Sequence, residues 1–442
     1  MSAPETSPLA EIERTVQERA RHLSLDMATE EGEQRLRQLL DDEIARWNDA
    51  HRRGQRAVGL PDPEGAAERA WRDLVRYGPL GALLDDDDVW EIMVNAPDLI
   101  FARRHHGPSG YHGEVFHDDA HVVRTLTKLL DDASSSHRRL DPTEGLQDAQ
   151  LDDGARVHIV HGDISRGGHV MVNIRKFTGV AYRSLDQLVD CGTLDARTAG
   201  FLRACVRAEL SIVVAGAPGS GKTTMLSCLA AELDPSLRVV VAEEVFEADV
   251  PAANVASMQT RAARADRPAV DLRRLVAGFL RMAPDVAIVG EVRDREALPL
   301  LLTLSSGVTG YTTIHAGSAR QALTRLRFIC QLADTAAGLP LSALNALVSE
   351  SIDVVVHLRR TPSGPRVTEV VAVEDLVGGP EAAHLTVSEV LRRQGSDGPL
   401  AWTGTVPSRA TRALADAGID VHELLADADG PWTASAWVGA TR

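Results

Sequence analysis

Cysteine is scarce in this sequence. Only four occur among 442 residues, and no two of them form a Cys-x-x-Cys pair. Scattered cysteines disfavour both a disulfide framework and a cysteine-ligated zinc site, and they are typical of a chain that works in a reducing compartment. The four are Cys191, Cys205, Cys228 and Cys330.

Long apolar runs are also missing. No stretch approaches the roughly 20 apolar residues that a membrane-spanning helix needs. Met1 is followed by the polar stretch SAPETSPLAEIE rather than by a basic and then apolar signal. We therefore expect a cytoplasmic protein that reaches the inner face of a membrane only through a partner.

Positive charge is in deficit. The chain has 47 Lys and Arg against 63 Asp and Glu, which gives a formal net charge of −16. This balance disfavours proteins that bind phosphate backbones or anionic lipid, because both need a basic face. We expect no direct contact with nucleic acid.

The remaining composition is ordinary. Hydrophobic residues make up 44% and charged residues 25%, proportions that are typical of a soluble globular protein. The length predicts two to three domains. Helical spacing of apolar residues predicts a helical region over residues 1–75, with one helix packing through Leu36, Leu39, Leu40, Ile44 and Trp47. Mixed patterns predict an α+β domain over 76–192. Strands alternating with helices predict an α/β domain over 193–378, followed by a C-terminal extension over 379–442.

Five β-branched runs supply the expected strands of the α/β domain. In the extension we expect helices over residues 385–395 and 408–428. The five runs are SIVVAGA, RVVVAEE, VAIVGE, TGYTTIH and DVVVHLRR.

An intact phosphate-binding loop, GAPGSGKT, follows the first of these runs and precedes a helix-forming stretch. Its glycines let backbone N–H groups surround phosphates at a helix N-terminus, while Lys222 reaches the β- and γ-phosphates and Thr223 ligates Mg²⁺. The sequence therefore predicts an ATP and Mg²⁺ site. Its residues are Gly216, Ala217, Pro218, Gly219, Ser220, Gly221, Lys222, Thr223 and Thr224.

Acidic residues end two later strands. Glu291 ends VAIVGE, and Glu243 and Glu244 end RVVVAEE. Ligands of open α/β sheets gather at the carboxyl ends of strands, so these acids are candidates for ordering the metal and the attacking water. Exposed strand-end acids without a function are the alternative.

Histidines raise two further questions. His315 stands alone in SSGVTGYTTIHAG, where a satisfied core or loop histidine is the simplest interpretation. The segment RRHHGPSGYHGEVFHDDAH fits either a metal site or a polar hairpin, and we favour the hairpin. Its histidines are His105, His106, His112, His117 and His121.

These motifs, in this order, resemble the secretion-ATPase superfamily, whose members drive type II secretion, type IV pili and type IV secretion. The stretches that carry the likeness are GAPGSGKTT, VVVAEE, LRMAPDVAIVGEVRDREAL and TGYTTIHAGSARQALTRL. Upstream, GPLGALLDDDDVWEIMVNAPD, DAQLDDGARVH and NIRKF resemble the tight-adherence (Tad/Flp, CpaF-type) pilus branch. The likeness covers roughly residues 77–375.

The resemblance implies a RecA-like ATPase domain, a homo-hexameric ring and an inner-membrane platform protein as partner. It implies Glu243 as general base, Glu291 in an atypical Walker B motif and His315 in a histidine box. It also implies that Arg156 and Arg175, from the smaller domain, approach the γ-phosphate. Surface arginines paired with acids are the alternative for these two residues.

The sequence departs from the family pattern in places. Val308 replaces one histidine of the usual pair, Ala283 and Gln150 replace arginines, and Asp294-Arg295 replaces a glycine pair. These departures leave open a nucleotide-binding regulatory ring subunit with weak hydrolysis. A conjugation-type DNA-secretion ATPase with the same core is a further alternative, which the acidic charge opposes.

Overall fold

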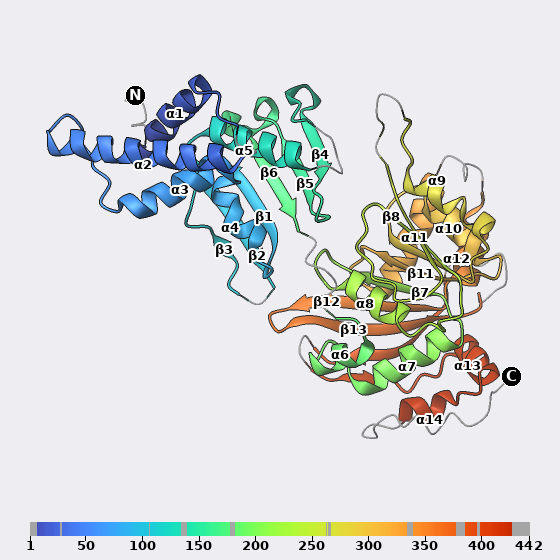
Figure 1. Ribbon diagram of the computed structural model, residues 1–442. Coiled ribbons are helices and arrows are strands. Elements are labelled where there is room, and N and C mark those ends of the chain that lie inside the picture. Colours follow the sequence, from blue (N-terminus) through green and yellow to red (C-terminus); the bar gives the residue numbers. More distant parts are fainter. Residues whose placement is uncertain are drawn as a thin grey trace. The chain divides into compact units, whose positions relative to one another are not determined.

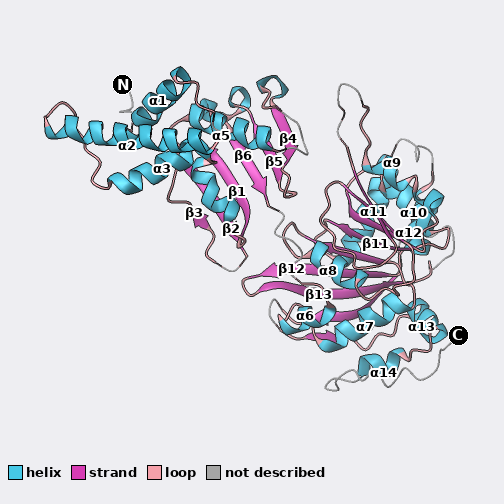
Figure 2. Ribbon diagram, viewed as in Figure 1, coloured by secondary structure: helices cyan, strands magenta, loops and turns pink. Residues whose placement is uncertain are grey.

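A computed structural model describes residues 7–26, 29–105, 107–133, 139–176, 182–261, 263, 267–333, 339–376, 385–395 and 398–426 (Figures 1 and 2). The chain forms two compact units, residues 1–178 and 179–442. The expected class is confirmed, with helices first, then an α+β domain and an α/β domain. No helix in the described part of the chain is both long and apolar enough to cross a membrane.

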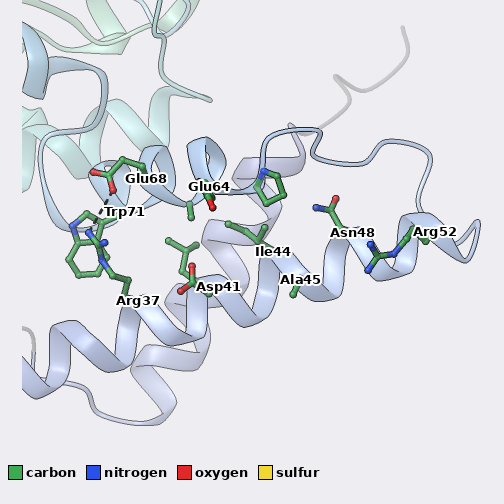
Figure 3. A pocket seen from close by; sticks show the side chains of 12 residues that line it. Arg37, Asp41, Ile44, Ala45, Asn48, Arg52, Glu64, Glu68 and Trp71 are labelled. Atoms are coloured by element: carbon green, nitrogen blue, oxygen red, sulfur yellow. Dashed lines mark ion pairs between the residues drawn. The ribbon is translucent and has the colours of Figure 1, made fainter.

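Three helices open the first unit: α1 (Pro8–His22), α2 (Glu30–Arg52) and α3 (Pro63–Val75). The apolar face predicted for α2 is confirmed, because all five of its residues are buried against α1 and α3. The Trp47 indole also donates to the Val58 carbonyl at 2.9 Å, which fixes the connection to α3. A groove of about 550 Å³ runs between α2 and α3, with the Arg37 guanidinium 4.7 Å above the Trp71 ring (Figure 3).

The rest of the first unit is a six-stranded antiparallel sheet in the order β3-β2-β1-β6-β5-β4. Its core is formed by α5 and one face of the central strands, where Leu126 and Leu130 pack with Ile92 and Val94. The strands are β1 (Val89–Ala96), β2 (Leu99–Arg104), β3 (Gly110–Tyr111), β4 (Leu146–Gln150), β5 (Arg156–Val160) and β6 (Met171–Arg175). The helices are η1 (Gly78–Leu80), α4 (Gly81–Asp85), α5 (Asp119–Asp132), η2 (Pro142–Glu144), η3 (Gly162–Ile164) and η4 (Arg166–Gly168).

The second unit is a nine-stranded sheet in the order β15-β14-β13-β12-β7-β11-β10-β8-β9. The run from β12 to β9 is parallel, and the remaining pairs are antiparallel. The strands are β7 (Ile212–Gly216), β8 (Val239–Glu243), β9 (Val255–Gln259), β10 (Val286–Val292), β11 (Thr309–Ile314), β12 (Val354–Thr361), β13 (Gly364–Val373), β14 (Val387–Arg393) and β15 (Leu400–Trp402). All five predicted strands are present.

Helices cover both faces of this sheet. Alternate residues of β7 face opposite cores, Ile212 and Val214 toward one and Val213 and Ala215 toward the other. The first core receives α6 (Leu185–Asp190), α7 (Ala196–Arg207), α8 (Lys222–Ala230), α13 (Ser408–Asp416) and α14 (Val421–Ala426). The second receives α9 (Leu272–Val276), η5 (Phe279–Met282), α10 (Ala297–Leu304), α11 (Ala319–Leu332) and α12 (Leu341–Ser351). A mainly parallel sheet with helices on both faces agrees with the RecA-like α/β domain that the resemblance implies.

The C-terminal part of the chain differs from expectation. The helix predicted over residues 385–395 is wrong, because β14 occupies this segment and pairs antiparallel with β13. Val390 and Leu391 are buried in the sheet, so pairing with a neighbouring strand outweighs the local helical pattern. The helix expected over 408–428 is present as α13 and α14, whose Leu414 and Leu425 join the first core of the α/β domain. Residues 427–442 lie outside the described residues.

Candidate functional site

The predicted phosphate-binding loop joins β7 to α8. Gly219 and Gly221 adopt φ values of +70° and +89°, which residues with a side chain rarely adopt. A Cβ atom on Gly216 would lie 2.4 Å from the carbonyl oxygen of Leu358, so β12 packs directly against the start of the loop. The helix begins at Lys222. The loop therefore presents its backbone N–H groups at a helix N-terminus, the arrangement that binds phosphate.

Lys222 is buried at the base of this loop, with 7% of its surface exposed. Its Nζ atom donates to the Ala217 carbonyl and to Nδ1 of His315, each at 3.2 Å. An ammonium group can only donate, so Nδ1 of His315 is the acceptor of this bond. The same Nδ1 lies 3.3 Å from the Gly216 carbonyl oxygen. Lys222 and His315, 93 residues apart in the sequence, are thus direct neighbours.

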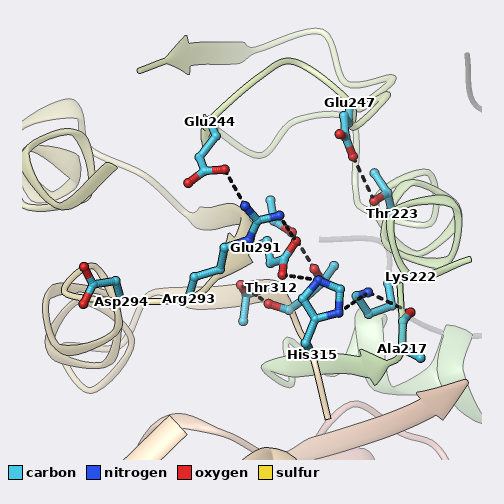
Figure 4. A network of polar contacts seen from close by, with 12 residues as sticks. Ala217, Lys222, Thr223, Glu244, Glu247, Glu291, Arg293, Asp294, Thr312 and His315 are labelled. Carbon is cyan, nitrogen blue, oxygen red and sulfur yellow. Dashed lines mark hydrogen bonds and ion pairs between the residues drawn. The ribbon is translucent and has the colours of Figure 1, made fainter. Parts of the chain in front are cut away.

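His315 also reaches the predicted Walker B strand. Its Nε2 atom lies 2.7 Å from Oε1 of Glu291 on β10. The strand order explains this contact: His315 directly follows β11, which lies between β7, the strand of the loop, and β10. The imidazole therefore bridges Lys222 of the loop and the strand-end acid Glu291 (Figure 4).

Glu291 stays ionised in this setting. Burial raises its pKa, but the contacts with His315 and Arg293 outweigh that effect and lower the pKa to about 2. Arg293 donates to Glu291 and to Glu244, both at 2.8 Å (Figure 4). A continuous polar network thus runs from Lys222 through His315, Glu291 and Arg293 to Glu244.

Oxygen ligands for a cation are close to the loop. The Thr223 hydroxyl lies 3.5 Å from a carboxylate oxygen of Glu247, and Glu291 supplies a second carboxylate (Figure 4). Mg²⁺ takes oxygen ligands, commonly one or two carboxylates together with phosphate oxygens, so this donor set fits Mg²⁺.

The sequence analysis missed Arg293 and Glu247. The signal for Arg293 was available, because it directly follows the last residue of β10 and stands two residues after Glu291. Glu247 follows β8 in an irregular loop, and nothing in its local pattern marks it.

Glu243, the predicted general base, is 3% exposed. Its Oε1 accepts from the backbone N–H groups of Glu247, at 3.2 Å, and Ala248, at 3.0 Å. A Cβ on Gly290 would come within 2.8 Å of the Glu243 side chain, so the glycine before Glu291 makes room for this acid. Glu243 holds the loop that carries Glu247, and its role as general base stays a prediction.

Arg156 and Arg175 belong to the first unit, which does not carry the phosphate-binding loop. They are cross-strand partners at one end of the pairing between β5 and β6. The two guanidinium groups therefore project from neighbouring positions of one sheet. Their approach to a γ-phosphate remains a prediction from the family resemblance.

Three relatives show the range of similar proteins. The chain is 33% identical to the type IV secretion system protein PtlH of Bordetella pertussis, over 64% of this chain and 89% of that protein. It is 30% identical to the probable conjugal transfer protein TrbB of Sinorhizobium fredii, over 67% of this chain and 86% of that one. An uncharacterized protein of Methanocaldococcus jannaschii is 33% identical over 57% of this chain, which spans 35% of that protein.

Among solved structures, the VirB11 ATPase of the Brucella suis type IV secretion system, in complex with sulphate, matches with 26% identity and a TM-score of 0.35. The match covers 66% of this chain and 94% of that one. The family model described as type II/IV secretion system protein matches residues 74–384. This match covers most of the chain, from the end of the helical region through the α/β domain. The chain belongs to the type II/IV secretion system protein family.

Proposed function

We propose that this protein is an ATP-hydrolysing motor that works as a homo-hexamer at the cytoplasmic face of the inner membrane. It would drive Tad/Flp-type pilus assembly, or a related type II/IV secretion process, by moving an inner-membrane platform protein. The observation that carries the proposal is the contact of His315 with both Lys222 and Glu291, because it joins the phosphate-binding loop to the acid of the Walker B strand.

Each group in this site has a task in phosphoryl transfer. Lys222 would leave His315 and donate to the β- and γ-phosphates, because their negative charge attracts the ammonium more strongly than the imidazole ring does. His315 would then be free to contact the γ-phosphate while still bonded to Glu291. Thr223 and Glu291 would hold Mg²⁺, which supplies charge neutralisation of the phosphates. The presence of the γ-phosphate would thereby alter a network that extends to Glu244.

The direct test is the Mg²⁺-dependent ATPase activity and the size of the purified full chain, with and without its platform protein. We expect hydrolysis above background, an assembly of six chains, and faster turnover with the partner. A chain that binds ATP but shows no Mg²⁺-dependent hydrolysis in either condition would instead fit the regulatory ring subunit.

A DNA-transfer motor is the second candidate, and the similarity to TrbB favours it. The net charge of −16 opposes it. Adding DNA to the same ATPase assay separates the two: a motor acting on DNA shows stimulation that falls steeply with salt. We expect DNA to leave the rate unchanged.

Replacing His315 by alanine should slow hydrolysis while ATP binding persists. The substitution leaves Lys222 and the loop in place but removes the bridge to Glu291. Loss of one such interaction, at about 1.4 kcal/mol, corresponds to a rate roughly tenfold lower. His422→Ala, an exposed histidine on α14, is the matched control and should behave as wild type. An unchanged rate in His315→Ala would assign this histidine to packing alone.

A further inference from the structure

Four side chains that could ligate a metal meet inside the first unit, the unit that does not carry the phosphate-binding loop. Glu13 comes from α1, Asp73 from α3, His117 from the loop before α5, and His121 from α5 itself. One ligand atom of each lies within 4.8 Å of the ligand atoms of the other three. Four separate segments of the chain thus direct nitrogen or oxygen ligands toward one point.

The cluster is shielded from solvent. The side chains of Glu13, Asp73 and His117 are 3%, 1% and 8% exposed, and His121 is fully buried. Nε2 of His117 lies 2.9 Å from Oε1 of Glu13 and 3.5 Å from Oδ2 of Asp73. Burying two carboxylates together is costly unless positive charge balances them.

One nitrogen in this cluster has no partner among the described residues. Nε2 of His121 is buried and accepts or donates no hydrogen bond, and Oδ2 of Asp73 also lacks one. Gly78 keeps the adjacent space open: a Cβ there would lie 3.2 Å from Nε2 of His121 and 3.0 Å from Oδ1 of Asp73. Because buried polar atoms in proteins are nearly always satisfied, an unpaired imidazole nitrogen beside carboxylates points to a bound group.

We propose that Glu13, Asp73, His117 and His121 bind a divalent transition-metal ion of the zinc class. Two imidazole nitrogens with two carboxylate oxygens form a donor set that Zn²⁺ accepts in four-coordinate geometry, whereas Ca²⁺ and Mg²⁺ take oxygen ligands. Four protein ligands leave no open position, so the ion is structural. It fastens α1 and α3 to α5, and so ties the N-terminal helices to the α+β domain.

The competing arrangement is an ion-pair network with no metal. Burial lowers the pKa of His117, but the carboxylates of Asp73 and Glu13 outweigh burial and raise it to about 9. A protonated His117 would then balance part of the acidic charge. That arrangement leaves Nε2 of His121 unsatisfied and predicts no metal affinity, so the two are separable by experiment.

The experiment is a Co²⁺ titration of the full chain after chelator dialysis, without nucleotide or Mg²⁺. We expect one Co²⁺ per chain, a visible absorption band typical of four-coordinate Co²⁺, and displacement of Co²⁺ by one equivalent of Zn²⁺. Absence of binding by Co²⁺ and Zn²⁺ up to millimolar concentration would overturn the proposal in favour of the ion-pair network.

Two variants test the ligands individually. His121→Gln and Asp73→Asn keep the side-chain size nearly constant and should each weaken Co²⁺ binding roughly tenfold or more. His158→Gln is the matched control, because His158 is exposed on β5 and its ring contacts the Asp148 carboxylate rather than the four proposed ligands. Unchanged affinity in both ligand variants would refute the assignment.

X-ray absorption of the zinc-loaded wild-type chain covers the case in which a variant does not fold. We expect nitrogen and oxygen scatterers at about 2.0–2.2 Å from the zinc ion, together with the more distant scattering that two imidazole rings produce. A spectrum with sulfur ligands or without imidazole would place the ion elsewhere and contradict the proposal.

Discussion

Lys222→Ala should abolish ATP hydrolysis. The ammonium of Lys222 is buried under the loop and is held by the Ala217 carbonyl and by His315, so it is positioned before any phosphate arrives. Removing one preorganised donor to developing charge typically costs at least about 100-fold in turnover, and this donor carries a full charge. A steady-state ATPase assay on the purified chain measures the loss.

Lys128→Ala is the control for that experiment. Lys128 lies on α5 in the first unit and pairs with Asp132 on the protein surface at 2.9 Å. Its removal should leave hydrolysis and assembly unchanged, because exposed ion pairs contribute little to stability. Robust hydrolysis by Lys222→Ala would reject the site assignment.

Glu291→Gln should separate binding from hydrolysis. The glutamine has the same shape, so the loop and Lys222 remain available to ATP. The variant nevertheless loses the carboxylate that the contacts with His315 and Arg293 keep ionised, at a pKa of about 2. Removing a group that helps to position a metal ion typically lowers metal affinity or activity by about 10–100-fold. Fluorescent-nucleotide binding and phosphate release, measured on the same sample, report the two effects.

Asp294→Asn is the matched control for Glu291→Gln. Asp294 follows Arg293, is exposed, and points away from the polar network (Figure 4). It should retain both binding and turnover. If Glu291→Gln turned over ATP at the wild-type rate, the ordering of the metal and water would have to come from another acid of the site, such as Glu243, Glu244 or Glu247.

Local patterns in the sequence predicted most of the fold. The glycine-rich loop, the apolar face of α2 and the five strands of the α/β domain could be predicted, because residues close together in the sequence determine each of them. The segment 385–395 shows where this reasoning ends. Its apolar residues suit a helix locally, but β13 offers an unpaired edge, and pairing with that edge decides the conformation.

The site shows the same division. Sequence motifs identified Lys222, Glu291 and His315 as candidate site residues. The contacts among these three side chains could not be predicted from the sequence. The network also includes Arg293, which directly follows β10 and contacts Glu244, which directly follows the neighbouring strand β8. Likewise, His117 and His121 were noticed in the sequence, but Glu13 and Asp73 belong to distant helices and carry no metal-binding signature there.

The sequence by itself determined the phosphate-binding loop, the alternation of strands and helices, and the acidic balance, because each is a property of neighbouring residues or of composition. Only the tertiary structure decided that His315 stands between Lys222 and Glu291, because that follows from the placement of β11 between β7 and β10. It also decided that two histidines and two acids from four segments share one buried site. Both arrangements depend on how distant elements pack, and packing is set by the whole core rather than by any local pattern.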